Sequence, residues 1–335
     1  MRKLLWLALV AAGLWGGYWF VGAATLERQT AAFFDAAAAN GLVARRDAIS
    51  VAGFPNRFDL TIDGVDIADP VTGFGWKAPF VQLLTMTWKP WHIIAAFPNE
   101  QVISTPDQSV TITSDRLIAS LHLHPQTALG LYETRLEAAN LAFASDLGWV
   151  IGVEKLFAST LEDAANPNRQ RLGVTVDNVA PDAKILAALT TTDLPGVIET
   201  LHLDATATFA APVQLAAPDV QPRLLAVDIK DARIIWGALK LTAAGSLAAG
   251  PDGVAAGTIT LRIDGWRRLP AVIAALGLVG PDLAPNIERG LDVMAKAGPD
   301  PEILELLLVC KDGRMSFGPF PLGPAPQFFG VASGA

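Results

Sequence analysis

Cysteine, histidine and cationic side chains are scarce in this sequence. Its 335 residues include a single cysteine, Cys310, so the chain folds without an intramolecular disulfide. Because Cys310 ends the apolar run 303–310, we expect a small buried hydrophobic residue, with a reactive thiol as the alternative. Lys and Arg number 25 against 33 Asp and Glu, and this negative balance opposes binding to phosphates. We therefore expect no nucleic-acid partner.

Sequence motifs of the common catalytic sites are also missing. The chain contains no G-x-S-x-G elbow, no H-E-x-x-H, no P-loop and no G-x-G-x-x-G. Among its four histidines, His122 and His124 would share one face of a strand, but no third zinc ligand stands nearby. We predict no catalytic residue, no metal and no cofactor. An envelope hydrolase with an unrecognised site, centred on these two histidines, is kept as a minor alternative.

The longest distinctive feature is an apolar run at residues 4–25, preceded by two cations, whose only ionisable side chain is Tyr18. At about 1.5 Å per residue it can reach across the roughly 30 Å hydrocarbon core of a bilayer. The preceding cations favour an N-terminus on the inner side, and Trp15 and Trp19 would mark the outer interface. We interpret the run as an uncleaved signal anchor. A signal peptide cleaved after Ala23 is the alternative, and both interpretations export the body.

The body begins with a predicted Ala-rich helix at 26–41, which would extend the anchor outward, and then changes to short strands bounded by Gly, Pro, Asn and Asp. The first two strands would form a hairpin at Asp63-Gly64. A spacing of about a dozen residues fits antiparallel sheet better than βαβ units. The strand candidates of this half are 58–62, 65–68, 80–89, 91–97, 108–113, 116–124, 134–143 and 172–179.

The second half combines strands and late helices. Strands at 201–207 and 258–264 alternate apolar and polar residues, which predicts one apolar and one wet sheet face. The hairpin 302–317 would close at Asp312-Gly313, and the Pro/Gly segment 318–326 would hold no regular structure. The other predicted elements are helices at 181–191, 269–278 and 283–297, and strands at 200–209, 224–229, 233–239, 240–247 and 257–264.

These patterns predict an α+β fold, mostly antiparallel β, with strongly twisted or curved sheets and a few covering helices, after one N-terminal transmembrane helix. We divide the chain into a signal anchor or signal peptide at 1–25, a helix and antiparallel β half at 26–180, a second β half with late helices at 181–317, and a Pro/Gly-rich tail at 318–335. Strand order does not follow from the sequence, because pairing registers depend on contacts between distant residues.

Four residues are candidates for ligand binding. Arg57 lies in the corner G-F-P-N-R-F at 53–58, where its planar guanidinium could bind a lipid phosphate or a partner carboxylate. The structural alternative is stacking on Phe58 or pairing with an acid. Trp76, Trp88 and Trp91 crowd one part of the body, either as the core of a sheet packed on a helix or as the lining of an apolar groove near the membrane.

Together, the basic Trp-rich anchor, the Ala-rich helix, the 53–58 corner, the Ala78-Pro79 and Lys89-Pro90 pairs and the final G-P-F-P-L-G at 318–323 resemble a bacterial family of unknown function, the domain-of-unknown-function family numbered twenty-one twenty-five. The resemblance covers nearly the whole chain and is typical of alphaproteobacteria. It implies an exported, membrane-anchored protein and supplies no catalytic residues. The strand-rich second half is also similar in style to AsmA-like envelope proteins, which carry lipids between membranes.

We therefore predict a non-enzymatic protein anchored in the bacterial inner membrane, with its N-terminus inside and its body in the periplasm. It would bind or transport a lipid or another apolar ligand in envelope maintenance, because the chain is 51% hydrophobic and carries an anchor. A structural or scaffolding module that recruits envelope protein partners is the main alternative.

Overall fold

The computed structural model describes residues 1–190, 192–215, 222–280, 282, 284–317 and 320–328. Over these residues the chain is mostly antiparallel β-sheet, with one long N-terminal helix and a few short helices, so the predicted α+β class is confirmed. The chain forms two compact units. Unit 1 contains residues 1–125 and 134–148, and unit 2 contains residues 126–133 and 149–335.

Unit 1 is built around two long antiparallel strands. β3 (Arg57–Ala68) pairs along its length with β4 (Gly75–Met86), so that Arg57 faces Met86 and Ala68 faces Gly75. The other edge of β3 pairs with β1 and β2, and β4 pairs with β5 at one end and with β6 at the other. The remaining strands are β1 (Val43–Arg45), β2 (Ala48–Ala52), β5 (Lys89–Ala96), β6 (Glu100–Ser104), β7 (Ser109–Thr113), β8 (Arg116–Leu123) and β9 (Leu131–Ser145).

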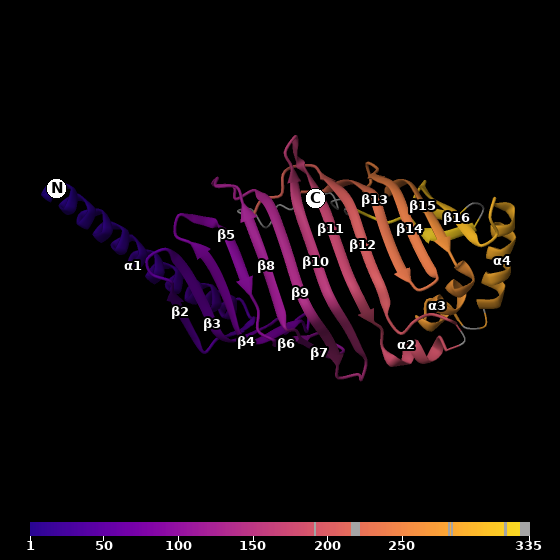
Figure 1. Ribbon diagram of the computed structural model, residues 1–335, viewed down its shortest axis with the longest axis horizontal. Coiled ribbons are helices and arrows are strands. Elements are labelled where there is room, and N and C mark those ends of the chain that lie inside the picture. The colour runs from indigo at the N-terminus through magenta and orange to yellow at the C-terminus, as the bar shows by residue number, and fades with distance from the viewer. Residues whose placement is uncertain (191, 216–221, 281, 283, 318–319, 329–335) are drawn as a thin grey trace. The chain divides into compact units, whose positions relative to one another are not determined.

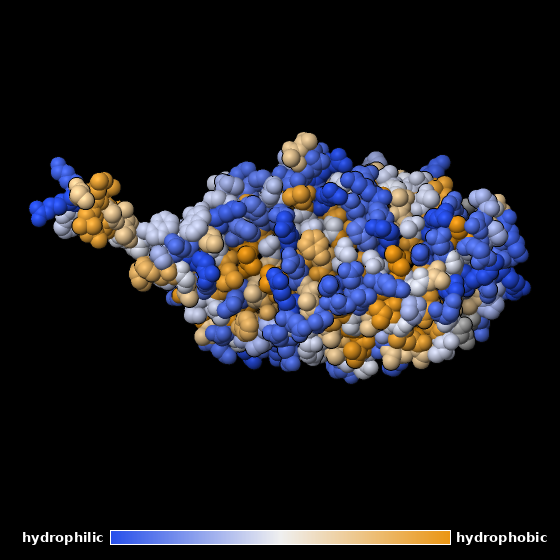
Figure 2. Space-filling model, in the orientation of Figure 1, coloured by the Kyte–Doolittle hydropathy of each residue, from blue (hydrophilic) through white to orange (hydrophobic). Residues whose placement is uncertain are grey.

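One uninterrupted helix, α1 (Arg2–Ala39), joins the apolar N-terminal run to this sheet. Trp19 is the first residue of the helix that is buried, and the side chains before it are exposed (Figure 2). α1 is long and apolar enough to cross a membrane by length and composition. The helix predicted at 26–41 is therefore present, and it continues the apolar run as expected.

Unit 2 is an antiparallel meander in which each strand pairs with the next along the chain (Figure 1). This order needs only short connections between neighbours, apart from the helical segments that follow β11 and β15 and the 14 residues, 210–223, between β12 and β13. Its strands are β10 (Val150–Asp163), β11 (Asn166–Ala180), β12 (Ile198–Phe209), β13 (Leu224–Trp236), β14 (Leu239–Ala249), β15 (Ala255–Asp264), β16 (Ile303–Lys311), β17 (Arg314–Phe317) and β18 (Phe320–Pro324).

The two faces of the unit 2 sheet differ in polarity, as the alternating strands predict. On one face Leu203 of β12 lies between Val174 of β11 and Ala232 of β13. The opposite face carries ion pairs between neighbouring strands, such as Arg171 with Asp204 at 2.7 Å. The hydrogen bond from Arg171 holds the pKa of Asp204 below its usual value. A similar pair joins Arg262 of β15 to Glu305 of β16, and Arg233 pairs with Asp231 within β13.

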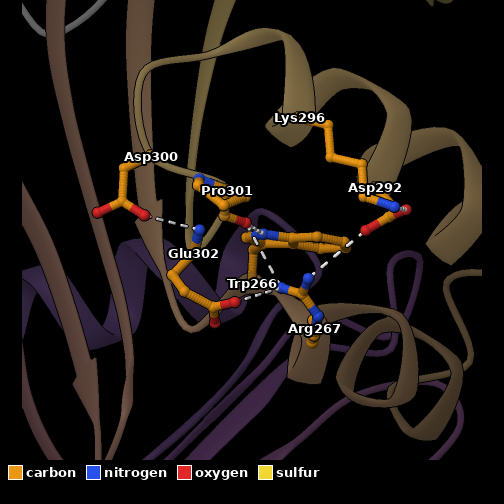
Figure 3. Close-up of polar contacts among 7 residues, drawn as sticks. All are labelled: Trp266, Arg267, Asp292, Lys296, Asp300, Pro301 and Glu302. Carbon is orange, nitrogen blue, oxygen red and sulfur yellow. Dashed lines mark hydrogen bonds and ion pairs between the residues drawn. The ribbon is translucent and has the colours of Figure 1, made fainter.

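Short helices cover the apolar face at the β14–β16 end of unit 2. They are α2 (Ala183–Ala188), the 3-10 turn η1 (Trp266–Arg268), α3 (Leu269–Ala275) and α4 (Ala284–Ala297). The fully buried Trp266 is the centre of this core, and its indole N–H donates to the carbonyl of Pro301 at 3.1 Å (Figure 3). Arg267 lies over the Trp266 ring and pairs with Asp292 and Glu302 (Figure 3). This cluster fixes α4 and the start of β16 to η1.

One predicted turn is wrong. Asp63-Gly64 does not close a hairpin, because β3 runs straight through both residues to Ala68. Gly64 has φ +61° inside the strand, and a Cβ there would lie 2.1 Å from the Asp47 carboxylate. Glycine is therefore required by a close approach within the sheet, and the turn lies later, at 69–74.

The C-terminal segment also differs in part from the prediction. The hairpin at Asp312-Gly313 is confirmed, but 320–324 forms β18 on β17 where no regular structure was expected. The prolines of β18 are tolerated because at the edge of a sheet only alternate residues of a strand need to donate a backbone hydrogen bond to a neighbour. Residues 318–319 and 329–335 of the predicted tail, and the predicted helix termini at 191 and 283, lie outside the described residues.

Candidate functional site

The second half of α1 lies on the unit 1 sheet and contacts it with small and aromatic side chains. Trp19 and Ala23 pack with Phe58 of β3, and Phe34 packs with Leu60 and its neighbours. A Cβ on Gly22 would lie 2.6 Å from the Phe58 ring, so the helix backbone approaches this ring closely. These contacts hold α1 close to the sheet at two separated points.

Two apolar clefts lie between these contact points, beneath α1. The inner cleft, of about 400 Å³, begins at Tyr18, and the outer cleft, of about 380 Å³, extends to Phe34. Both share a part of their lining, formed by Leu26, Gln29, Leu60 and Leu83. The inner cleft is completed by Val21, Gly22, Thr25, Phe58, Thr85, Pro90 and Ile93, and the outer one by Thr30, Phe33, Ile62, Val65, Ile67, Trp76 and Val81.

Polar groups that line the clefts mostly have partners in the protein already. The Tyr18 hydroxyl donates to the Thr87 carbonyl at 3.0 Å, and the Thr25 hydroxyl donates to the Val21 carbonyl at 2.7 Å. The Thr85 hydroxyl is within reach of the carbonyl of His92 at 2.9 Å. Lining groups with satisfied hydrogen bonds leave an essentially apolar surface for an occupant.

Two turns of unit 1 are hydrogen-bonded to α1 near the Tyr18 end of the inner cleft. The Trp19 indole donates to the carbonyl of Arg57 at 2.6 Å, in the segment that follows the 53–56 corner. Thr87, which accepts the Tyr18 hydrogen bond, also donates its backbone N–H to the Asn56 carbonyl at 3.1 Å. The corner and the β4–β5 turn are thereby fixed at the level where the exposed part of α1 ends.

The structure distributes the four residues predicted to bind a ligand over different places. Trp76 lines the outer cleft, where its indole donates to Gln101 at 2.7 Å. Arg57 pairs with Asp59 at 2.6 Å, which is the structural alternative considered for it. Trp88 is exposed in the β4–β5 turn and Trp91 is half-buried on β5. Trp76 and Arg57 lie near opposite ends of the β3–β4 pair, roughly 30 Å apart at the usual rise per residue, and form no common site.

Sequence reasoning missed the residues shared by both clefts. Leu26 and Gln29 belong to the predicted helix, and Leu60 and Leu83 belong to predicted strands, but their convergence depends on how far α1 stands from the sheet. The available signal was the Ala-rich composition of the helix, because small side chains leave space between a helix and its support.

Two histidine side chains are in contact on the unit 1 sheet, outside the lining of the two clefts. His92 of β5 faces His122 of β8, and their rings stack with centroids 5.1 Å apart. Among the described residues no three His, Cys, Asp or Glu side chains are grouped to hold a metal ion. The pair therefore serves as a cross-strand contact in the structure.

A third hollow near α1 is charged. It has a volume of about 780 Å³ and is lined by Glu27, Arg28, Arg45, Arg46 and Asp47 with neighbouring small residues. Arg46 pairs with Asp35 at 3.0 Å and lies over the Phe34 ring. Charges of both signs at this opening make it a solvated surface that suits neither a purely apolar nor a purely anionic ligand.

Nearly the whole chain matches one known protein family. Residues 19–326 match the model of a family described as an uncharacterised protein conserved in bacteria (DUF2125). The chain belongs to this family. The resemblance predicted from the sequence is confirmed, whereas the similarity to AsmA-like proteins stays a prediction. No curated protein and no solved structure matches the chain.

The DUF2125 match includes the elements that form the clefts. It begins at Trp19, the first buried residue of α1, and ends beyond β18. The packing half of the helix is thus part of the family's common region together with both units.

Proposed function

We propose that this protein is a non-enzymatic, membrane-tethered protein whose clefts beneath α1 hold the acyl chains of a lipid or a similar apolar molecule. The first part of α1 anchors it in the bacterial inner membrane, with the N-terminus in the cytoplasm and the body in the periplasm, where it serves envelope maintenance. The observation that carries the proposal is the apolar inner cleft, whose lining includes Tyr18, at the point where the exposed apolar part of α1 meets the sheet.

The size and chemistry of the clefts support an apolar occupant. Volumes of about 400 and 380 Å³ lie within the range of roughly 300–1,000 Å³ that is usual for ligand sites. Removing water from apolar lining gains about 25 cal/mol per Å² of surface. Gln29, which lines both clefts, has no hydrogen-bond partner among the described residues and is available to a polar group of the occupant.

Retention of the N-terminal run is supported by its contacts with the body. Cleavage after Ala23 would remove both Trp19 and Ala23 from the cluster that they form with Phe58. It would also remove one wall of the inner cleft, at Tyr18, Val21 and Gly22. An uncleaved anchor keeps both the cluster and the cleft.

The proposal can be tested by lipid photocrosslinking of the full chain in vesicles of phosphatidylethanolamine and phosphatidylglycerol. The probe is a phospholipid with a diazirine near the end of one acyl chain, and the crosslinked peptides are mapped by mass spectrometry. We expect crosslinks in the first part of α1, from the surrounding bilayer, and separate crosslinks at 58–62 and 81–93. The second set reports acyl chains that have left the bilayer for the clefts.

Leu83→Trp should fill the part shared by both clefts, with Leu84→Trp as the matched control on the opposite face of β4. Excluding two methylene groups costs about 1.6 kcal/mol, so cleft crosslinks should fall by about ten-fold or more in the first variant only. Crosslinks in the first part of α1 serve as the internal reference. Crosslinks confined to α1 in the wild-type chain would refute lipid binding and favour the scaffolding role.

A further inference from the structure

The exposed apolar part of α1 is shorter than a bilayer. Residues 4–18 precede Trp19, the first buried residue, and 15 helical residues extend about 22 Å. The hydrocarbon core of a bilayer is roughly 30 Å thick and needs about 20 residues. A helix that spans the core must therefore draw the part of the body beside residues 19–23 into the outer boundary of the membrane.

Two turns of unit 1 occupy this level of α1. The β4–β5 turn is held by the hydrogen bond from Tyr18 to Thr87, and the 53–57 corner is held by the hydrogen bond from Trp19 to Arg57. Phe54 reaches back along the helix, since a Cβ on Gly16 would lie 3.6 Å from its ring. These turns surround the end of the exposed helix and cannot lie further from the bilayer than Trp19 itself.

The surface at this level is apolar and aromatic, with cations beside it. Phe20, Phe54, Met86 and Trp88 are 62%, 57%, 42% and 54% exposed, and we call these four residues the collar. Phe54 is in ring contact with Phe20 and with Trp19, at centroid distances of 5.5 and 5.4 Å. Arg57 and Lys89 directly follow the two turns, as the first residues of β3 and β5. Aromatic and cationic side chains in this combination are typical of the membrane–water interface.

We propose that the collar inserts into the outer interfacial layer of the same bilayer that α1 crosses. At the level of residues 16–20, Phe54 lies about 5–10 Å closer to the membrane than Ala23, which is the depth to which apolar side chains insert at the headgroup–acyl boundary. Insertion makes up the missing length of the helix and places the Tyr18 end of the inner cleft at the lipid surface. The inference rests on the proposed anchoring of α1, but it does not require that the clefts hold lipid.

The depth of three side chains tests this proposal in the full-length protein reconstituted in phosphatidylethanolamine–phosphatidylglycerol vesicles. Nitroxide labels are attached to Leu9→Cys, Phe54→Cys and Phe74→Cys, each made in a separate chain. Phe54 and Phe74 are both 57% exposed, but Phe74 lies in the turn at the opposite end of β3 and β4. The native Cys310 is buried and leaves the introduced thiol as the reactive one. Depth is read from relaxation by oxygen, which partitions into lipid, against a water-soluble nickel chelate.

We expect the label at 9 to lie within the core, the label at 54 in the interface with several-fold weaker nickel relaxation than at 74, and the label at 74 in water. A label at 54 as exposed to nickel as that at 74, with position 9 still in the core, would overturn the collar and leave the anchor intact. A label at 9 in water would overturn both the anchor and the collar. Trp88→Cys repeats the measurement in the neighbouring turn if Phe54→Cys does not fold.

Discussion

Single residues set the distance between α1 and the sheet of unit 1. Gly22 lies on the face of the helix that meets Phe58, and Gly17 lies on the exposed part of the same helix, where a Cβ would meet nothing within 4 Å. The two glycines therefore share a helix and differ in their surroundings, which makes them a matched pair.

Gly22→Ala should destabilise unit 1, whereas Gly17→Ala should not. The new methyl group would push against the buried Phe58 ring, and overpacking of this kind costs about 1–3 kcal/mol. Both variants gain up to about 1 kcal/mol from the higher helix propensity of alanine. The two free energies of unfolding should therefore differ by about 1–3 kcal/mol, measured by denaturant titration in detergent. Equal values would mean that α1 does not rest on Phe58.

The elements show which local signals determine structure. The terminal hairpin and the continuation of the apolar run into a helix were predictable, because both depend on neighbours in the sequence. β10 was not predicted, since Leu156 and Phe157 break its alternation. Phe157 lies opposite Thr175 and is 42% exposed, so an apolar residue occupies the wet face. The clefts were beyond prediction because the spacing between helix and sheet depends on contacts between residues far apart in sequence.

The helix α2 is held by a carboxylate that also binds a strand. Asp182 caps α2 by accepting from the backbone N–H of Lys184, and it accepts from Val150 at the start of β10, both at 2.9 Å. The hydrogen bond from Val150, followed by that from Lys184, lowers the pKa of Asp182 below its usual value.

Acid should therefore weaken this junction in the wild-type protein. A pKa that is lower in the folded than in the unfolded state stabilises the fold above the unfolded value of about 3.9, and this contribution is lost as the pH falls through the lower, folded value. Asp182→Asn should be less stable at pH 7 and lose less stability between pH 5 and 3 than the wild type, measured by Tm. Asp107→Asn, in the exposed turn before β7, is the control. If Tm fell by the same amount between pH 5 and pH 3 in Asp182→Asn and in the wild type, the assignment of this pH dependence to Asp182 would be contradicted.

On the scale of the whole molecule, α1 contains both the apolar N-terminal run and residues that pack in the core of unit 1. Trp19 and Ala23 lie in the apolar run and in the core cluster with Phe58 at the same time. The Trp19 side chain is only 7% exposed and its indole donates to the Arg57 carbonyl, so it packs on unit 1; its position at the outer membrane interface stays a prediction. The apolar run and the part of the helix that packs on the sheet are therefore one continuous element.

Two truncations should separate these roles. Removal of residues 2–17 keeps the cluster, whereas removal of residues 2–25 deletes Trp19 and Ala23 and should cost unit 1 about 3 kcal/mol or more. Hydrogen exchange at 58–62 should then be about a hundredfold faster in the longer truncation, with β11 and β12 of unit 2 unchanged. Identical protection at 58–62 in both truncations would show that the cluster does not stabilise unit 1.

Continuity of α1 also has a mechanical consequence. The helix runs from Arg2 to Ala39 without a break, and its second half packs on the sheet. We therefore expect its two halves to move together as one rigid element. Helices adjust to bilayers of different thickness by tilting. Because α1 is also a wall of both clefts, the proposed anchoring predicts that a change in membrane thickness, by tilting the helix, would change the width of the clefts.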